Sequence, residues 1–172
     1  MVVLLRFLKS LFTSRFRPKI GPLGESVLRM RVWPNDLDLN MHVNSGRYLS
    51  FMDIGRVDLL VRMRVFRKVI SLGWRPINGG TMIAYKKSLL LWERFTVRTR
   101  IVCWDEKWIY FEHTIERQNG DVASIANARG LFRGRDGNIA PSQLLTIVGL
   151  EGTESPPMTA SISHWRSAEA AR

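Results

Sequence analysis

The sequence is poor in the residues that build disulfides and metal sites. Its 172 residues include one cysteine and three histidines. The single cysteine, Cys103, excludes an intrachain disulfide, so nothing in the composition requires an oxidising compartment. Cys103 and the histidines have no zinc-site spacing, and the G-x-S-x-G, P-loop and H-E-x-x-H motifs are all absent. We therefore expect no bound metal and no cofactor.

Acidic residues are scarce in the middle of the chain. Residues 62–100 contain one acid, Glu93, against ten bases, and the whole chain has a formal net charge of +11. Such a field attracts polyanions: nucleic acid, anionic lipid, or a phosphorylated small molecule such as coenzyme A. Zinc-finger spacing, an RNP-type aromatic motif and a basic heptad are all missing, so nucleic acid is not an expected partner. A simple solvated basic face stays open as the alternative.

The N-terminal stretch also lacks acids. From Met1 to Lys19 it carries five bases among leucines and phenylalanines. It is too short and too charged to span a bilayer, and it lacks the long apolar region and cleavage site of a secretory signal. Two interpretations stay open: an interfacial amphipathic helix with bases at the lipid headgroups, or a poorly ordered or core-docking arm. We expect a cytoplasmic protein, peripheral to the inner face of an anionic membrane under the first interpretation.

The chain divides into three parts around one expected domain. Residues 1–25 form the basic, apolar arm and a linker that prolines and glycines interrupt. Residues 26–150 form the domain, and residues 151–172, rich in Ser, Ala and Thr, are predicted to be a mobile tail. Within the domain, a strand at about 27–33 precedes one long helix at about 46–65. The predicted strands that follow cover residues 81–91, 95–103, 109–115 and 122–133. One helix followed by antiparallel strands predicts an α+β fold.

The most informative segment joins the first strand to the helix, from Asp36 to Tyr48. It packs two acids, an imidazole and two amides into thirteen residues. Asp38 is therefore expected on a loop that leads into a helix N-terminus, where backbone N–H groups are free and carry partial positive charge. A carboxylate beside such an anion-stabilising end suits attack on a carbonyl group. From the residues alone, a turn or cap role for Asp38 stays open.

This segment resembles the hotdog-fold acyl-CoA thioesterases of the 4-hydroxybenzoyl-CoA type. Their pattern is roughly D-x-D-x-x-G-H-V-N-N-x-x-Y, and the matching residues are Asp36, Asp38, His42, Val43, Asn44 and Tyr48. Met41 replaces the usual Gly, and Ser45 replaces a frequent Asn. The D-L-D-L start is more similar to the thioesterase-superfamily-member-six branch. The resemblance covers roughly residues 25–150 and implies a long central helix wrapped by an antiparallel sheet, and subunits that pair as dimers or dimers of dimers.

The resemblance also implies roles for individual residues. Asp38 corresponds to the nucleophile or general base that acts on the thioester carbonyl. A backbone N–H at or near Ser45 corresponds to the donor that stabilises the oxyanion. His42 is a candidate catalytic residue that polarises or positions the substrate, with a local hydrogen-bonding role equally open. Substrate binding is assigned to Asn44, Tyr48, Lys86, Lys87 and Arg98, of which the three bases are candidates for the CoA phosphates.

Met41 leaves two functions open. The expected function is hydrolysis of an acyl-CoA thioester to the free acid and CoA. Because Met does not cheaply reproduce the backbone freedom of Gly, a non-catalytic acyl-CoA or fatty-acyl binding module is the alternative. Asp36 is expected to be structural. His113, on an apolar strand face, is expected to be a core histidine.

Overall fold

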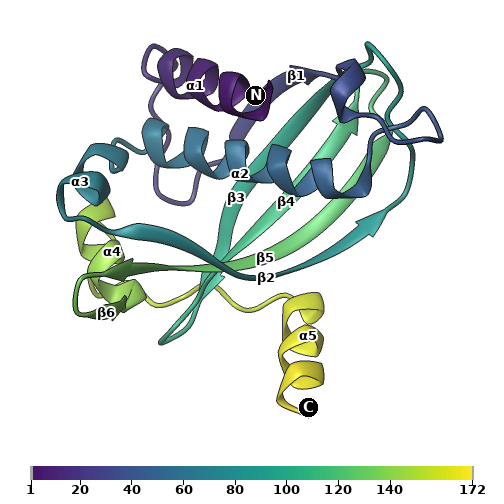
Figure 1. The fold of residues 1–172 in the computed structure, drawn as a ribbon. Coiled ribbons are helices and arrows are strands. Elements are labelled where there is room, and N and C mark those ends of the chain that lie inside the picture. Colours follow the sequence, from purple (N-terminus) through teal and green to yellow (C-terminus); the bar gives the residue numbers. More distant parts are fainter. Residues whose placement is uncertain (1, 172) are drawn as a thin grey trace.

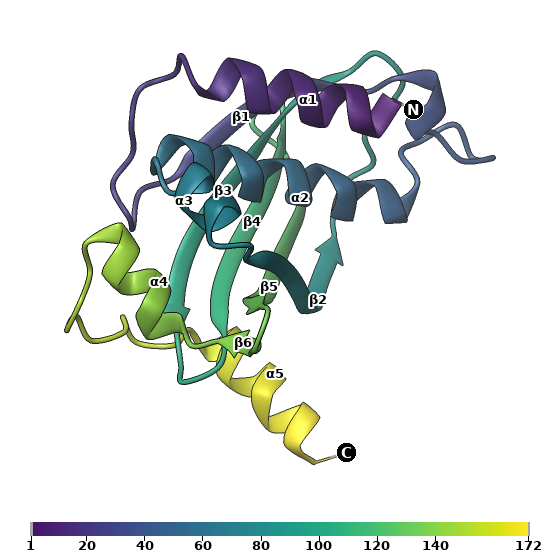
Figure 2. The ribbon, with the colours of Figure 1, turned by 60° about the vertical axis from the view of Figure 1, so that its left-hand side comes forward.

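The computed structural model describes residues 2–171, shown in Figures 1 and 2. Five α-helices, one 3-10 helix and six strands follow one another within the described chain. In chain order they are α1 Val2–Ser14, β1 Ser26–Arg31, η1 Pro34–Asp36, α2 Ser45–Arg62, α3 Phe66–Ser71, β2 Arg75–Tyr85, β3 Arg94–Trp104, β4 Ile109–Arg117, β5 Val122–Gly134, β6 Gly137–Ile139, α4 Pro141–Val148 and α5 Ala160–Ala170.

One antiparallel sheet, with the strand order β1-β3-β4-β5-β2, curls around the long helix α2 (Figure 1). The short strand β6 pairs with β5 at the sheet end. This arrangement confirms the α+β prediction and the hotdog architecture. The strand predicted at residues 81–91 is shifted, because Gly79 and Gly80 form a bulge inside β2 and not its start. β2 therefore runs from Arg75 to Tyr85.

Helix α2 lies very close to the sheet. Its buried face includes Tyr48, Met52 and Leu59, as the spacing of apolar residues predicts. At the point of closest approach, a Cβ atom added to Gly55 would lie 2.4 Å from Oγ1 of Thr99 in β3. Gly55 is therefore a packing requirement, which outweighs its low helix propensity.

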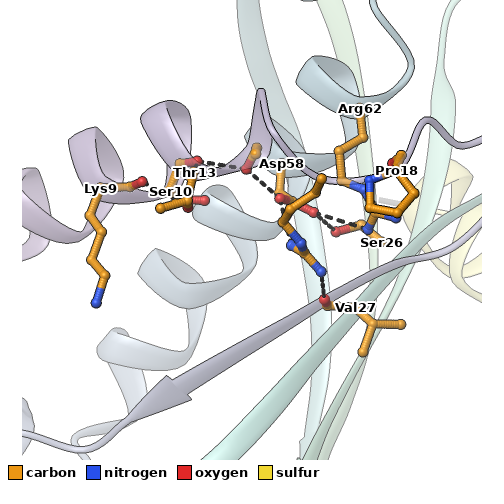
Figure 3. A network of polar contacts seen from close by, with 10 residues as sticks. Lys9, Ser10, Thr13, Pro18, Ser26, Val27, Asp58 and Arg62 are labelled. Atoms are coloured by element: carbon orange, nitrogen blue, oxygen red, sulfur yellow. Dashed lines mark hydrogen bonds and ion pairs between the residues drawn. The ribbon is translucent and has the colours of Figure 1, made fainter.

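Helix α1 docks onto α2 through polar contacts around Asp58, whose side chain is fully buried (Figure 3). The Asp58 carboxylate accepts hydrogen bonds from Ser14, Ser26 and Arg17, and Arg62 lies 3.6 Å away. From the sequence alone, the i,i+4 spacing of Asp58 and Arg62 predicts a pair on the solvent-exposed face of the helix. That prediction is wrong for both residues, because α1 and its linker cover this face and Arg62 is only 8% exposed.

The C-terminal segment also differs from the sequence-based expectation of a mobile tail. Its residues 160–170 form α5, and Ile162 is fully buried beside Cys103 and Tyr110. The Arg129 guanidinium lies over the rings of Trp108 and Trp165, at 4.8 and 5.2 Å from their centroids, and forms an ion pair with Glu169. These contacts attach α5 to the sheet. The division of the chain into arm, domain and tail otherwise stays a prediction.

Candidate active site

The loop that carries Asp38 is a tight turn closed by backbone hydrogen bonds. The Asp38 N–H donates to the His42 carbonyl at 2.9 Å, and the Met41 N–H donates to the Asp38 carbonyl at 3.1 Å. Leu37 and Val43 pair across the base of the turn. The turn requires a left-handed residue at Met41, whose φ is 59°. Met41 therefore adopts the backbone conformation that a glycine would adopt more easily, and the turn is kept.

The Asp38 carboxylate is held within this turn and still reaches solvent. One oxygen, Oδ1, accepts the Asn40 N–H at 2.9 Å. The other, Oδ2, lies 3.3 Å from Nδ1 of His42, and the Asp38 side chain is 23% exposed. The carboxylate is thus oriented by its neighbours at the protein surface, where a substrate has access.

Asp36 is buried beneath the turn and ties it to α1. Its two carboxylate oxygens accept hydrogen bonds from the Arg6 guanidinium at 2.8 and 2.7 Å. The Trp33 N–H donates to the same carboxylate at 2.8 Å. The Asp36 carbonyl accepts the Asn44 N–H at 2.8 Å. Asp36 therefore fixes the positions of both the turn and the start of α2, in keeping with its expected structural role.

The N-terminus of α2 presents a free backbone amide. Asn44 is the N-cap residue, and its side-chain Oδ1 accepts the Gly46 N–H at 2.9 Å. The Arg47 N–H donates to the Asn44 carbonyl at 2.9 Å. Within residues 2–171 the Ser45 N–H has no hydrogen-bond acceptor. The first turn of α2 can therefore offer this amide, together with the positive end of the helix dipole, to an anion.

Asp38 and Asn44 line the same open depression, of about 780 Å³. Its walls are largely apolar and come from Leu37, Leu39, Met41 and Leu91. A second, more polar depression of about 400 Å³ adjoins it and shares Leu37 and Asn44. The site thus combines a carboxylate, a helix N-terminus and an apolar wall.

The segment after β2 borders this site, which the sequence did not reveal. The Leu89 carbonyl accepts the Val43 N–H at 2.9 Å, and Leu90 pairs with His42. At the end of β2, the Tyr85 hydroxyl donates to the Ser45 carbonyl at 3.0 Å. In the sequence, this segment stands out only as the run Leu89-Leu90-Leu91, which is equally typical of the end of a buried strand.

Lys86 and Lys87 lie in this bordering segment, and both are exposed. The Lys87 ammonium is 3.1 Å from the Asp121 carboxylate. Arg98 lies elsewhere: its neighbours Val97 and Thr99 face α2, so its side chain projects from the opposite face of the sheet. Its guanidinium there contacts Glu25 and Glu116 at 2.7 and 2.9 Å. The two lysines therefore belong to the segment that borders the site, although neither lines the two depressions, and Arg98 belongs to another part of the sheet.

Two further residues belong to the core and do not line the site. Tyr48 is 3% exposed and packs against Phe51 and Tyr85, and burial raises the pKa of its hydroxyl. His113 is fully buried, with Nδ1 3.0 Å from Oγ1 of Thr99. Burial, helped by the Arg56 charge, lowers the pKa of His113 to about 3, so its ring is neutral.

A sheet curled around one long helix, with a carboxylate on the loop that enters that helix, defines a hotdog protein of the thioesterase type. The sequence model of the Thioesterase-like superfamily matches residues 32–165. The chain belongs to that superfamily, which confirms the expected class, a thioester hydrolase, at the level of the family.

Individual relatives agree with this assignment. Protein THEM6 from Xenopus laevis is 33% identical over 155 residues, which cover 87% of this chain and 73% of that protein. Protein THEM6 from Danio rerio is 32% identical over 145 residues, 83% of this chain and 69% of that protein. They confirm the expected similarity to the member-six branch. The DHNA-CoA thioesterase from Staphylococcus aureus has the same fold, with a TM-score of 0.66 at 15% identity over 72% of this chain and 85% of that chain.

Proposed function

We propose that this protein hydrolyses an acyl-CoA thioester at Asp38. The observation that carries the proposal is the depression in which the partly exposed Asp38 carboxylate and the capped N-terminus of α2 meet. Both groups that thioester cleavage requires are present there: a carboxylate that attacks the carbonyl or activates water, and a donor for the charge that develops on its oxygen. The Thioesterase-like match and the fold shared with a CoA thioesterase support this function.

In this mechanism the Ser45 N–H stabilises the oxyanion and Asn44 holds the helix end in place. Such a preorganised donor stabilises the transition state more than the ground-state carbonyl. His42, with Nδ1 at 3.3 Å from the Asp38 carboxylate, is assigned to orienting that carboxylate. The apolar wall of Leu37, Leu39 and Met41 would receive the acyl group.

The CoA phosphates are assigned to Lys86 and Lys87. Both side chains are exposed on the segment that borders the site, between the contacts of Tyr85 with Ser45 and of Leu89 with Val43. Because these ammonium groups are exposed, they can bind phosphates without breaking a buried ion pair. Arg98 is a weaker candidate, because its guanidinium already contacts two carboxylates on the other sheet face.

A homodimer is proposed from the open edge of the sheet. β2 is an edge strand of 11 residues, and most of its residues are exposed, including Ile77 and Met82. A long unpaired edge is a template for pairing with another strand, here β2 of a second copy. In such a dimer, two sheets would join and the segment after β2 would lie close to the partner.

The test is a hydrolysis screen over acyl-CoA chain lengths that measures released thiol. Replacing Asp38 with Asn keeps the shape of the side chain and removes its charge. We expect Asp38→Asn to lower turnover by roughly 10²-fold or more, the scale of a lost acid/base group. The matched control is Asp53→Asn on the exposed side of α2, which should leave turnover unchanged. Equal turnover in a folded Asp38→Asn variant would exclude this role.

A non-catalytic acyl-CoA binding module is the second candidate. It is favoured by one observation: both Asp38 oxygens already have partners inside the turn, Asn40 and His42. Saturable binding of acyl-CoA, followed by calorimetry, with no thiol released at any chain length would select this candidate.

A further inference from the structure

The apolar face of α1 points away from the protein. Its outward side chains are between 50% and 75% exposed when Phe16, just after the helix, is included. These residues, which we call the outer apolar face, are Leu4, Leu5, Leu8, Phe12 and Phe16. The rings of Phe12 and Phe16 contact each other edge to face at 5.3 Å between centroids. A helix of a globular protein normally buries such a stripe, so its exposure needs an explanation.

The opposite, inward face of α1 is polar. Ser10 and Ser14 are buried against α2, and Arg6 is 12% exposed with its guanidinium on Asp36. The same guanidinium lies over the Phe51 ring at 5.3 Å from its centroid. Both views in Figures 1 and 2 show α1 as an outer layer that runs beside α2, next to strand β1 at the edge of the sheet. The buried carboxylates of Asp36 and Asp58 therefore fix α1 with its apolar side outward.

The charge around this face is of one sign. Residues 1–24 contain five bases and no acid. Two of the bases, Arg6 and Arg17, are used inward in ion pairs with Asp36 and Asp58. Lys9, Arg15 and Lys19 are exposed. An apolar stripe flanked by exposed bases matches a surface that is apolar below and anionic at its rim.

We propose that the outer apolar face of α1 docks onto an anionic lipid surface, with Lys9, Arg15 and Lys19 at the headgroups. A second copy of the chain fits less well, because two such faces would bring together bases with no acid between them. Among the described residues no helix is long and apolar enough to span a bilayer. α1 would therefore lie in the plane of the interface. Docking does not require Asp38 to be catalytic, so it can succeed or fail independently of thioester hydrolysis.

The test is co-sedimentation of the full chain with vesicles. One set contains phosphatidylcholine and phosphatidylserine, the other phosphatidylcholine alone. We expect sedimentation with the anionic vesicles, and a loss of binding as salt rises, since screening shortens the reach of surface charges. The double variant Leu8→Ser/Phe12→Ser should lower the partition constant by roughly 10²-fold, because each side chain contributes about a tenfold effect. Lys9→Glu and Arg15→Glu should each lower it by roughly fivefold or more.

The matched controls lie on α3, which offers exposed residues of the same kinds. Ile70→Ser/Leu72→Ser removes two exposed apolar side chains at the end of α3, and Arg67→Glu or Lys68→Glu reverses exposed charges. These variants should sediment like the unchanged protein, and circular dichroism should show that all variants are folded. Docking through α1 is overturned if the unchanged protein stays in the supernatant with anionic vesicles, or if the α3 and α1 variants lose binding equally. It is also overturned in favour of a second copy if the α1 double variant dissociates an oligomer in vesicle-free buffer.

Discussion

Met41 preserves the conformation of the Asp38 turn at a cost in the stability of the fold. Its φ of 59° lies in the left-handed region, where a side chain costs about 1–2 kcal/mol. In Met41→Gly this strain is removed, while the greater freedom of the unfolded chain offsets about 0.4–1 kcal/mol of the gain. We expect a net increase of about 0.5 kcal/mol in the free energy of unfolding, measured in urea.

A β-branched residue gives the matched comparison at the same position. Met41→Val should lower the free energy of unfolding by about 1 kcal/mol, because β-branched residues at positive φ are outliers. Since Met41 is 63% exposed, neither change is confounded by lost core packing. A Gly variant less stable than the Val variant would contradict the strained turn.

His113 should make the stability of the fold depend on pH. The pKa of His113 is lowered to about 3, whereas an unfolded histidine titrates near 6.5. Between these pH values the unfolded chain binds one more proton at His113 than the folded chain does. The contribution of His113 to the free energy of unfolding is therefore fully present above about pH 6.5 and is lost as pH decreases. The slope is about 1.4 kcal/mol per pH unit for one group.

Urea unfolding at pH 7.5 and at pH 5.5, on the order of one unit above and below the unfolded pKa, measures this contribution. In His113→Gln, whose amide can still pair with Thr99, the extra loss of stability at the lower pH should disappear. The control His164→Gln changes an exposed histidine, and this variant should still show the extra loss of stability at the lower pH. A pH dependence shared by both variants would assign the effect to other groups.

Among the secondary-structure elements, α1 contacts both the loop of the candidate active site, through Arg6, and helix α2, through Ser14. Arg6 pairs with the fully buried Asp36 beneath the Asp38 turn. Removing one partner of a buried pair leaves an uncompensated charge, which typically costs about 3–5 kcal/mol. We expect Arg6→Met to lower the free energy of unfolding by about 3 kcal/mol.

Turnover should fall in the same variant, because the turn that orients Asp38 loses its anchor. The control Arg15→Met removes an exposed base from the same arm and should change neither quantity. Thiol release and urea unfolding on both variants provide the measurement. Full stability in Arg6→Met would mean that α1 is not needed to hold Asp36.

The elements themselves were largely predictable, and their mutual contacts were not. The long helix and the strands follow from periodic spacing of apolar residues, a local signal. The burial of Asp58 could not be predicted from the spacing within its helix, because it depends on α1, which lies far away in sequence. The sequence does not predict α5, because this Ser- and Ala-rich helix has a single buried residue, Ile162.

The candidate site was predictable only where its residues are adjacent in sequence. The motif predicts the position of Asp38 and the start of the helix, both within one continuous segment. Leu89 and Leu91, which come from the segment after β2, gave no distinguishing signal. The charge of Arg98 makes it a candidate from the sequence, and only the sheet geometry shows that it projects from the far face.

For the whole molecule, the unpaired edge of β2 predicts a homodimer in which the β2 strands of two copies pair. Placing a charge on this edge should oppose strand pairing between two copies. We expect Met82→Lys or Ile77→Lys to raise the dimer dissociation constant by roughly tenfold or more, the equivalent of about 1.4 kcal/mol. Light scattering over a concentration series measures the change.

The control for this prediction is Leu72→Lys, which adds the same charge at an exposed apolar position outside the sheet. It should leave the dissociation constant unchanged. A monomer at all concentrations in the unchanged protein, or a dimer insensitive to both β2 variants, would contradict pairing through this edge.

The order of strands in the sheet has a consequence for synthesis on the ribosome. β1 pairs with β3, and β2 pairs with β5. Because each partner strand is synthesised later, neither β1 nor β2 can pair when it leaves the ribosome. Such non-local pairing is slow to form and leaves strand edges exposed in the meantime. Helix α1, which precedes all the strands in the chain, also keeps its outer apolar face uncovered in the finished fold. The nascent chain should therefore depend on chaperones, or on early capture by a lipid surface, until residue 134 at the end of β5 has left the exit tunnel.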